Sequence, residues 1–595
     1  LLGSTFALAA RLIRAPDPGA RAYLWESSGA VFGGIVFSFL LIRWLDPLQT
    51  ALLVGGLNLT TAAALLLPRS LSRSLPCPTA PLLLGSLVLL TIGALVVGHA
   101  LHTTTLSWQW SDLIFATDSP YGRHSVVARA GQRAFFTNGL LTFETQSTFP
   151  EEVVHLPLLA HPAPRSVLLV GGGVAGDLRE ILGHPTQEIV YVELDPAVIR
   201  AAREHLPHHQ AAVLDDPRVH LILSDGRRYV QTADRDFDAI ILDLPEPSTG
   251  ALNRFYTQEF FTEVQALLNR GGILSLGLPS AENYWSPELA RRNASVYWSL
   301  REIFPHVLVL PGEHNFFLAS DQPLPSAPEE LSSQMEERGI EPRRVTPDYI
   351  EYLFTTDRFA QVQGELADMG DVRRNRDRRP ICYYYDLVLW LSRFYPRLLG
   401  ELRELPLQIG TLVVLAGMIG LARWRRGLAV PLAVAAVGLA EMALEVVILF
   451  AFQIGHGTLY GRVSLVVTVF MAGLVAGALA GRRLTQWAHQ VLLGIVGGVA
   501  ALGALLTALP VSASVLAYVL LALAAGGFAG AAFPLALTLV SVEESQAAGL
   551  LYAADLAGGC LGALVTAALF VPLLGLDQTA VLITLVGVAG MVMLI

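Results

Sequence analysis

The pattern of hydrophobic and polar positions divides the chain into two apolar ends and a polar centre. Apolar stretches at both ends reach about 20 residues, the length that an α-helix needs to cross the hydrocarbon core of a bilayer. Residues 102–404 are charged and interrupted by prolines, and short apolar runs there alternate with amphipathic stretches. The pattern predicts an α-helical polytopic membrane protein with an inserted soluble α/β domain. The apolar segments are 1–14, 23–45, 49–68, 80–101, 405–424, 427–455, 458–481, 488–509, 513–541, 548–574 and 577–595.

These segments define four regions of the chain. We expect N-terminal transmembrane helices over 1–101, a small β region over 102–165, an α/β domain with its linker over 166–404, and seven transmembrane helices over 405–595. The chain begins at Leu1 within an apolar run and without Met, so we expect residues upstream to be missing.

An internal repeat links the two apolar ends, because the segments near 1–68 resemble those near 513–595. The shared pattern Y-x-x-[E/D]-x-x-G-x-x-x-G begins at Tyr23 and again at Tyr552, and the same alignment continues without gaps into a Gln-Thr-Ala match. Acids and glycines that keep their spacing predict two copies of one helical unit.

The predicted helices carry acids, which the interior of a bilayer disfavours. The repeat aligns Glu26 with Asp555, and Glu441 and Glu445 lie in another apolar segment. Such acids can line a polar path or proton site, as in a transporter, or they can cap a helix or bond to a neighbouring helix. We favour the second interpretation for each of the four.

The loops between the apolar segments differ in arginine content. Ten arginines fall in alternate short loops, whereas the opposite loops hold only Arg43 and Arg462. Because cytoplasmic loops are the basic ones, we expect the protein in the plasma (inner) membrane with its soluble domain on the non-cytoplasmic side. Arg393, Arg397 and Arg403 flank that domain and favour the opposite orientation. The ten are Arg11, Arg14, Arg21, Arg69, Arg73, Arg423, Arg425, Arg426, Arg482 and Arg483.

Composition narrows the chemistry further. Charged residues make up 15% of the 595 positions, against about 25% in soluble domains. All 40 Lys+Arg positions are arginine, which excludes a lysine Schiff base and a Walker A lysine. Cys77, Cys382 and Cys560 are too far apart for a zinc or haem motif, so we expect no metal. The net charge of −10 gives no indication of a nucleic-acid partner.

The soluble region has the pattern of a nucleotide-binding sheet. A glycine-rich turn, Gly171-Gly-Gly-Val-Ala-Gly176, follows an apolar strand and opens a helix at Asp177. Three later strands end in acids or lead directly into one. The four strands are expected at 166–170, 189–193, 219–223 and 239–243.

The acids at these strand ends are Glu193, Asp225 and Asp243. Open α/β sheets bind ligands outside the carboxyl ends of their strands, so we expect the three carboxylates to surround one pocket for an adenosyl moiety. Glu193 suits a ribose diol, and Asp225 could accept from an adenine amino group. The glycines could also serve only to tighten a strand–helix junction. A dinucleotide is disfavoured, because Asp243-Leu-Pro-Glu246-Pro suits recognition of a cation.

Residues 110–392 resemble the spermidine synthases, or polyamine aminopropyltransferases, and specifically their membrane-fused relatives. The resemblance implies a Rossmann-like fold of the S-adenosylmethionine-dependent methyltransferase type, preceded by a small β region. The motifs are Tyr121-Gly122, His155-Leu-Pro-Leu-Leu-Ala-His161, Gly171-Gly172-Gly173 with Leu178-Arg-Glu-Ile, Val192-Glu193-Leu-Asp195-Pro196, Asp225-Gly226, Asp243-Leu-Pro-Glu246-Pro247, Tyr256-Thr257-Gln-Glu259-Phe260-Phe261 and Asn375-Arg-Asp377-Arg-Arg-Pro380.

The resemblance also implies an activity: transfer of an aminopropyl group from decarboxylated S-adenosylmethionine to a diamine. Asp243 would orient the attacking amine and take its proton. The amine substrate, a polyamine precursor, would be bound by Glu246, Glu151 and Tyr256. The donor would be bound by Gly171, Gly173, Gly176, Glu193, Asp225 and Gly226.

Three departures from the family pattern lie around the amine. Val174 stands where the family has an Asp, Thr142 where it has a Gln, and Phe149-Pro150-Glu151 where it has Tyr-His-Glu. An ammonium ion that loses carboxylate partners loses its main binding interaction. Three interpretations therefore remain: a membrane-anchored transferase, a catalytically silent subunit that docks a partner in a membrane complex, and a transporter with a synthase-like domain.

Overall fold

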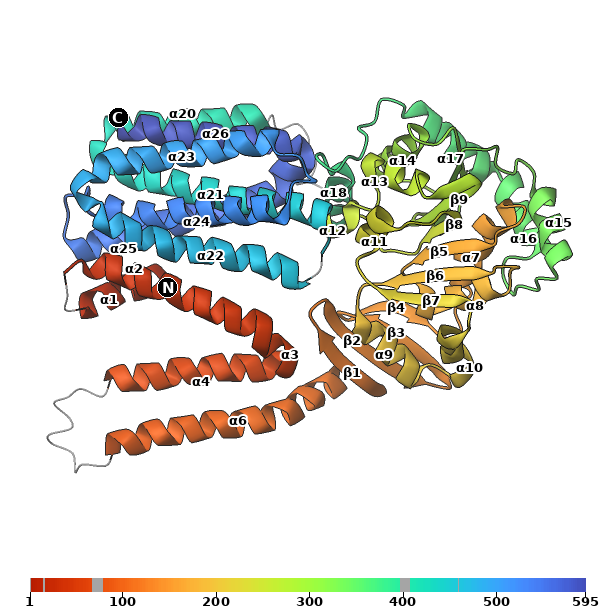
Figure 1. Ribbon diagram of the computed structural model, residues 1–595, viewed down its shortest axis with the longest axis horizontal. Coiled ribbons are helices and arrows are strands. Elements are labelled where there is room, and N and C mark those ends of the chain that lie inside the picture. The colour runs from red at the N-terminus through yellow and green to blue at the C-terminus, as the bar shows by residue number, and fades with distance from the viewer. Residues whose placement is uncertain (1, 14–15, 67–78, 396–406, 459) are drawn as a thin grey trace.

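The computed structural model describes residues 2–13, 16–66, 79–395, 407–458 and 460–595. Long helices fill one side of the molecule, and an α/β domain fills the other (Figure 1). Several residues used above for orientation or chemistry lie outside the described residues, namely Leu1, Arg14, Arg69, Arg73, Cys77, Arg397 and Arg403.

The helical side is built from both ends of the chain. Its helices overlap the predicted apolar segments but differ in their bounds. The helix α6 continues to Gln109 instead of ending near 101, and α2, α25 and α26 begin at Pro18, Glu544 and Val571 instead of near 23, 548 and 577. Eight helical stretches within the described ranges are long and apolar enough to cross a membrane. The N-terminal helices are α1 (Leu2–Leu12), α2 (Pro18–Val36), α3 (Ile42–Trp44), α4 (Pro47–Leu66) and α6 (Thr79–Gln109). The C-terminal helices are α20 (Leu407–Trp424), α21 (Ala429–His456), α22 (Tyr460–Arg483), α23 (Ala488–Ala508), α24 (Val515–Leu537), α25 (Glu544–Val565) and α26 (Val571–Leu594).

Small residues form the tightest crossings between these helices. α22 lies along α24 (Figure 1), and a Cβ on Gly477 of α22 would overlap the carbonyl oxygen of Gly527 in α24. Gly530 approaches Leu474 just as closely. Apolar helices gain no hydrophobic energy from each other in lipid, so close van der Waals packing must supply their association.

The two segments matched by the repeat pattern share an unusual backbone feature. A π-helical segment, Phe37–Leu41, follows α2, and a second, Thr566–Phe570, follows α25 at the equivalent position of the shared pattern. Aromatic rings also pair reciprocally between the two ends. Phe6 stacks on Tyr552 at 4.2 Å between ring centroids, and Phe533 stacks on Tyr23 at 4.5 Å.

The α/β domain contains a seven-stranded sheet in the order β10-β11-β9-β8-β5-β6-β7. β5 to β9 are parallel, and β11 runs antiparallel to both of its neighbours, β9 and β10. This is the Rossmann-like arrangement expected from the sequence, and the four predicted strands are β5 to β8. The strands are β5 (Ser166–Val170), β6 (Glu188–Glu193), β7 (Val219–Leu223), β8 (Phe237–Leu242), β9 (Leu268–Pro279), β10 (His306–Leu310) and β11 (His314–Ser320).

Helices cover both faces of this sheet, which is why its central strands are apolar throughout. Along β5, Val167 and Leu169 belong to one hydrophobic core, and Leu168 and Val170 belong to the other. The first core includes residues of α7 (Phe149–Ala160), α8 (Asp177–Leu182), α9 (Pro196–His205), α15 (Pro328–Arg338) and α16 (Pro347–Thr355). The second includes residues of α11 (Gly226–Thr232), α13 (Gln258–Gln265), α14 (Pro287–Arg301), α17 (Asp357–Asp368) and α18 (Ile381–Phe394). Two short helices complete the domain, α10 (His208–Ala211) and α12 (Gly250–Asn253).

A four-stranded antiparallel sheet lies between α6 and this domain (Figure 1). Its His124 contacts Asp195, the N-cap residue of α9, with 2.7 Å between Nε2 and Oδ2. The small sheet is thereby attached to the helix that begins just after Glu193. Its strands are β1 (Leu113–Ser119), β2 (Gly122–Arg129), β3 (Gln132–Thr137) and β4 (Leu140–Glu144).

The glycine crossing predicts a specific sensitivity. Gly477→Ala is expected to destabilise the protein by about 1–3 kcal/mol, because the added methyl group must push α22 away from α24. Gly494→Ala in α23 is the matched control, because nothing lies within 4 Å of the added Cβ. The thermal unfolding midpoints of the purified full chain, measured at one scan rate, test the difference. Equal midpoints for the two variants would contradict it.

Candidate active site

The glycine turn after β5 is needed for close backbone packing. Gly171, Gly172 and Gly176 have positive φ angles of 78°, 66° and 133°. A Cβ on Gly171 would overlap the carbonyl oxygen of Asp243, and one on Gly173 would lie 2.6 Å from the ring of Tyr191. The turn therefore sits directly against the ends of β6 and β8.

Backbone hydrogen bonds align the carboxyl ends of the four central strands. The N–H of Asp243 donates to Val170 O at 3.1 Å, and that of Gly171 donates to Val192 O at 3.1 Å. The N–H of Ser224 donates to Glu193 O at 3.0 Å. The predicted acids thus lie at the carboxyl ends of β6, β7 and β8, on the same side of the sheet as the glycine turn after β5. The strand order reverses at β5.

Two carboxyl groups meet beneath the glycine turn. A Cβ on Gly172 would collide with Oδ2 of both Asp243 and Asp177, so these two oxygens are neighbours. Asp177 is fully buried, and within the described residues no N–H or hydroxyl group donates to its carboxyl oxygens. The carboxyl group of Asp243 is thus a close polar neighbour of this buried acid.

Burial is the main cause of the raised pKa of both carboxyl groups. It raises the pKa of Asp177 well above its ordinary value, and the charge of Asp243 raises it further. Burial also raises the pKa of Asp243, while the hydrogen bond from Asp177 partly offsets the increase. Asp243 is therefore the member of the pair that ionises first, and its carboxylate is poised as a proton acceptor.

Glu193 is held by its own strand end. Its Oε1 accepts from the N–H groups of Leu194 and Asp195 at 2.7 and 3.0 Å, and its Oε2 accepts from the Tyr191 hydroxyl at 2.9 Å. Burial raises the pKa of Glu193. Each carboxylate oxygen has two lone pairs, so Oε2 can still accept a hydrogen bond from a ligand.

Asp225 is fully engaged within the protein. Arg254 forms a bidentate ion pair with its carboxylate, and the N–H of Arg228 donates to Oδ1 at 3.0 Å. Thr458, in the loop between α21 and α22, donates to Oδ2 from both its N–H and its hydroxyl at 3.0 Å. Burial alone would raise the pKa of Asp225, but Arg254 holds it at about 2. These five donors exceed the roughly four lone pairs of a carboxylate.

The predicted amine-binding residues lie in different surroundings. The hydroxyl of Tyr256 lies 2.8 Å from Pro245 O and 3.1 Å from Leu244 O, so this buried side chain supports the loop after Asp243. Burial, and after it the charges of Asp243 and Glu246, raise the pKa of Tyr256. Within the described ranges, no hydrogen bond or ion pair engages the carboxylate of Glu246.

Glu151 and Gly226 have clear structural contacts. Glu151 is 2% exposed, and its carboxylate accepts from Arg343 and from the N–H of Arg344. It therefore fixes the start of α7, whose Pro150 would touch a Cβ on Gly176 at 2.9 Å. A Cβ on Gly226 would lie 2.5 Å from Val170.

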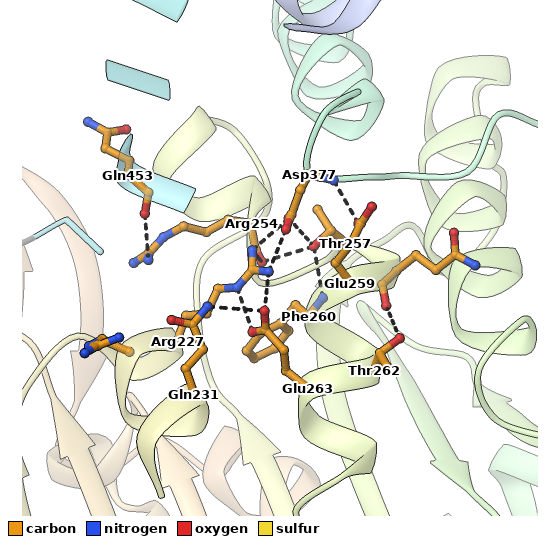
Figure 2. A network of polar contacts seen from close by, with 12 residues as sticks. Arg227, Gln231, Arg254, Thr257, Glu259, Phe260, Thr262, Glu263, Asp377 and Gln453 are labelled. Atoms are coloured by element: carbon orange, nitrogen blue, oxygen red, sulfur yellow. Dashed lines mark hydrogen bonds and ion pairs between the residues drawn. The ribbon is translucent and has the colours of Figure 1, made fainter. Parts of the chain in front are cut away.

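A buried polar network lies behind the site and joins it to the closing Asn375–Pro380 segment (Figure 2). Arg227 donates to both oxygens of Asp377 at 2.7 and 2.6 Å and to both oxygens of Glu263. The Thr257 hydroxyl also donates to Asp377, at 2.7 Å. Thr257 caps α13, so Asp377 fixes the helix that follows Tyr256.

Sequence reasoning named the acids on the strands but missed their partners. Asp177 was expected only as the first residue of a helix, although an acid three positions after Val174 is a usable signal. Arg254 had no such signal, because Asp225 lies 29 positions before it and Thr458 lies 233 positions after Asp225. The predicted binding roles of the individual residues stay predictions.

Comparisons with known proteins place this site in a family. Residues 147–295 match the spermine/spermidine synthase domain. The polyamine aminopropyltransferase of Korarchaeum cryptofilum is 41% identical over 135 residues, which cover 23% of this chain and 42% of that protein. That of Corynebacterium efficiens is 33% identical over 276 residues, 45% of this chain and 52% of the relative. The chain thus spans about half the length of these curated relatives, or less.

A shorter relative is covered more fully. Polyamine aminopropyltransferase 1 of Hyperthermus butylicus is 34% identical over 234 residues, which cover 37% of this chain and 78% of that protein. The solved spermidine synthase of Thermotoga maritima aligns at 23% identity and a TM-score of 0.37, over 43% of this chain and 88% of that one. The matched domain contains the glycine turn and the acids of the sheet edge, and the chain belongs to the spermine/spermidine synthase family.

Proposed function

We propose that this chain is a membrane-anchored transferase that moves an aminopropyl group from decarboxylated S-adenosylmethionine, or a related adenosyl donor, to an amine. The observation that carries the proposal is the contact between the buried Asp177 and the partly buried Asp243 beneath the glycine turn. Its family relatives are named polyamine aminopropyltransferases. A carboxylate with a raised pKa, held at the carboxyl edge of such a sheet, suits proton removal from an amine.

The reaction is a displacement at a carbon bonded to a positively charged sulfur. The lone pair of a neutral amine nitrogen attacks that carbon, the carbon–sulfur bond breaks, and its electron pair stays on sulfur to give methylthioadenosine. The new bond leaves the nitrogen positively charged, and Asp243 accepts one of its protons. The domain contributes alignment of the two reactants and a place for the proton.

Asp177 supplies the carboxyl group that Val174 lacks. The family pattern has an Asp at that position of the turn, and here an acid three positions later reaches the same side of Gly172. Asp177 acts as a positioning residue in this proposal, because it donates a hydrogen bond that favours the ionised form of Asp243. In this proposal, Asp177 supplies the carboxyl group on the side of the pocket that faces the amine.

The donor and the amine would bind to opposite sides of this pair. Glu193 accepts from the ribose through Oε2, and Gly171, Gly173 and Gly176 allow close approach of the nucleoside. Glu246, whose carboxylate has no hydrogen-bond or ion-pair partner within the described ranges, attracts the amine. Tyr256 supports the loop after Asp243, and Glu151 fixes the start of α7. Gly226, at the start of α11, and the other predicted residues make up the proposed site.

The contacts of Asp225 suggest a second candidate function. Its acceptor sites are filled by Arg254 and Thr458, so it binds adenine only if the loop between α21 and α22 withdraws. If that loop never withdraws, the domain is a silent subunit whose role is to hold partners in a membrane complex. The two readings differ in ligand binding, which can be measured.

The helices anchor the domain in a bilayer in this proposal. Eight stretches have the necessary length and apolarity. The equivalent π-helical segments and the reciprocal Phe6–Tyr552 and Phe533–Tyr23 stacks support two copies of one helical unit. Tyr552 donates to Glu26 across this contact, which supports interhelical bonding for that acid in preference to a transport path.

Asp243→Asn is expected to lower kcat by about 10²–10⁴-fold, because the amide cannot accept the proton. Asp177→Ala is expected to move the acidic limb of the pH–rate profile to higher pH, because loss of the donated hydrogen bond raises the pKa of Asp243. Asp177→Asn keeps a donor and should leave the limb nearly in place. Release of methylthioadenosine by the full chain is the measurement. An Asp243→Asn variant with wild-type rates would contradict the assignment.

Thr458→Val is expected to strengthen binding of methylthioadenosine roughly 2- to 12-fold, because it removes one neutral hydroxyl donor that competes for Asp225. Thr468→Val is the control, since that hydroxyl donates only to Ser464 O within its own helix. Isothermal titration calorimetry of the full chain gives the affinities. If neither the wild type nor either variant binds methylthioadenosine, the silent-subunit reading replaces the transferase.

The proposed orientation predicts a protease pattern. Trypsin cuts this chain only after arginine, because it has no lysine. Trypsin added to spheroplasts should cleave within residues 166–380 and spare the loops at Arg423–Arg426 and Arg482–Arg483, whereas inverted vesicles should show the reverse. Cleavage of the domain only in inverted vesicles would place it in the cytoplasm and overturn the orientation, and extraction of the chain by alkaline carbonate would overturn membrane insertion.

A further inference from the structure

A second charged cavity lies at the junction of the α/β domain and the helices, outside the proposed transfer site. It has a volume of about 490 Å³ and is lined by five arginines and only two carboxylates, Glu259 and Asp577. The arginines lie within and just before the closing Asn375–Pro380 segment, at residues 373–379. The opposite wall is formed by the kinked start of α26, including Leu574. The cavity therefore carries a strong excess of positive charge next to an apolar helix.

Two of the five arginines have structural partners. Arg378 forms an ion pair with Asp577 and donates to Leu509 O at 3.0 Å, while its own carbonyl accepts from the N–H of Leu576 at 2.7 Å. Arg374 forms an ion pair with Glu302 at 2.7 Å. These contacts hold the closing segment against the helices and engage Asp577 and Glu302, whereas Glu259 accepts from the N–H of Asp377 at 2.9 Å.

The other three arginines, Arg373, Arg376 and Arg379, are less fully engaged. In the part of the chain that the structure describes, no carboxylate pairs with Arg373 or Arg379, and the nearest contact of Arg376 with one is 3.8 Å, to Glu302. Arg373 donates to Leu573 O at 3.4 Å. Nε of Arg379 is buried without a hydrogen-bond partner, although burying a donor in this way costs about 1–3 kcal/mol.

We propose that this cavity binds a phosphate-type anion, supplied by the headgroup of an anionic phospholipid. Arginine forks match phosphate oxygens in pairs. Within the described residues Arg373 and Arg379 have no carboxylate partner, and Arg376 has only the contact with Glu302 at 3.8 Å. Basic pockets at the membrane ends of helices are suited to such headgroups, and Leu574 continues the wall toward the apolar helices. The lipid source rests on the membrane anchoring proposed above, whereas binding of the anion itself does not.

The electrostatics separate this site from the transfer site. An amine substrate is a cation, and the arginine cavity repels it, whereas the carboxylates at the sheet edge attract it. Burial, followed by the charge of Arg373, lowers the pKa of Arg379. An anion between Arg373 and Arg379 would relieve that repulsion.

The test uses the full chain in a neutral detergent, titrated with short-chain phosphatidylglycerol, with short-chain phosphatidylcholine and with inorganic phosphate. Phosphatidylglycerol should bind more tightly than phosphatidylcholine. The triple change Arg373→Gln, Arg376→Gln and Arg379→Gln should weaken phosphatidylglycerol binding about tenfold or more. The control removes the same charge from three exposed arginines elsewhere, Arg129→Gln, Arg200→Gln and Arg270→Gln, and should leave binding unchanged.

The outcomes separate the sources and the two sites. Inorganic phosphate that competes fully with phosphatidylglycerol would support the anion site and replace the lipid by a soluble phosphate. Equal phosphatidylglycerol binding by the wild type and the triple variant, or an equal loss in the control, would overturn the proposal. Methylthioadenosine binding and the unfolding midpoint, measured on the same samples, report the transfer site and the fold. If the triple variant unfolds, Arg373→Gln alone, on an exposed side chain, gives the comparison, and unchanged binding would again overturn the proposal.

Discussion

A buried ion pair of the α/β domain, between Arg254 and Asp225, lies at the contact between the two halves of the molecule and bonds to the helices. The guanidinium of Arg254 binds both oxygens of Asp225 at the edge of the sheet. It also donates to Gln453 O near the end of α21, at 3.4 Å (Figure 2). Thr458 completes the contact from the same helical side. Burying two charges costs several kcal/mol, and the cost is offset only when most of their hydrogen-bonding capacity is used. Arg254 and Arg228 supply three of the five donors to Asp225 from within the domain, and Thr458 supplies the other two, so contact with the helices completes the hydrogen bonding of the carboxylate.

This contact places the loop between α21 and α22 against a residue of the proposed nucleoside pocket. In a soluble domain, an acid after the third parallel strand would face solvent or a ligand. In this chain a loop between two apolar helices occupies it, and a Cβ on Gly457 would already lie 3.0 Å from the carboxyl carbon of Asp225. Small movements of α21 relative to α22 would therefore act on Asp225 directly. In the proposed function, this geometry would couple membrane anchoring to ligand binding.

The sequence predicted what depends on local pattern. The strands of the central sheet, the glycine turn and the helix that begins at Asp177 follow from short-range periodicity and turn chemistry. It could not predict the pairing of Asp177 with Asp243 or of Asp225 with Arg254, because those contacts depend on how strands and loops meet in space. The same limit explains Glu151, which looked like a ligand-binding acid and is engaged by Arg343 and Arg344, far along the chain.

The closing segment shows how one short stretch can serve both sites. Asn375 is fully buried and donates to Tyr256 O at 2.8 Å, and the Tyr256 hydroxyl in turn supports the loop that follows Asp243. Two residues on either side of Asn375 are Arg373 and Asp377, which face the arginine cavity and the Arg227 network respectively. An anion that ordered Arg373 and Arg376 would therefore restrain the backbone that positions Tyr256. The charge excess at the arginine cavity and the carboxylates at the sheet edge are thus linked through a single hydrogen-bonded asparagine, which would let an anion bound in the proposed cavity act on the proposed transfer site.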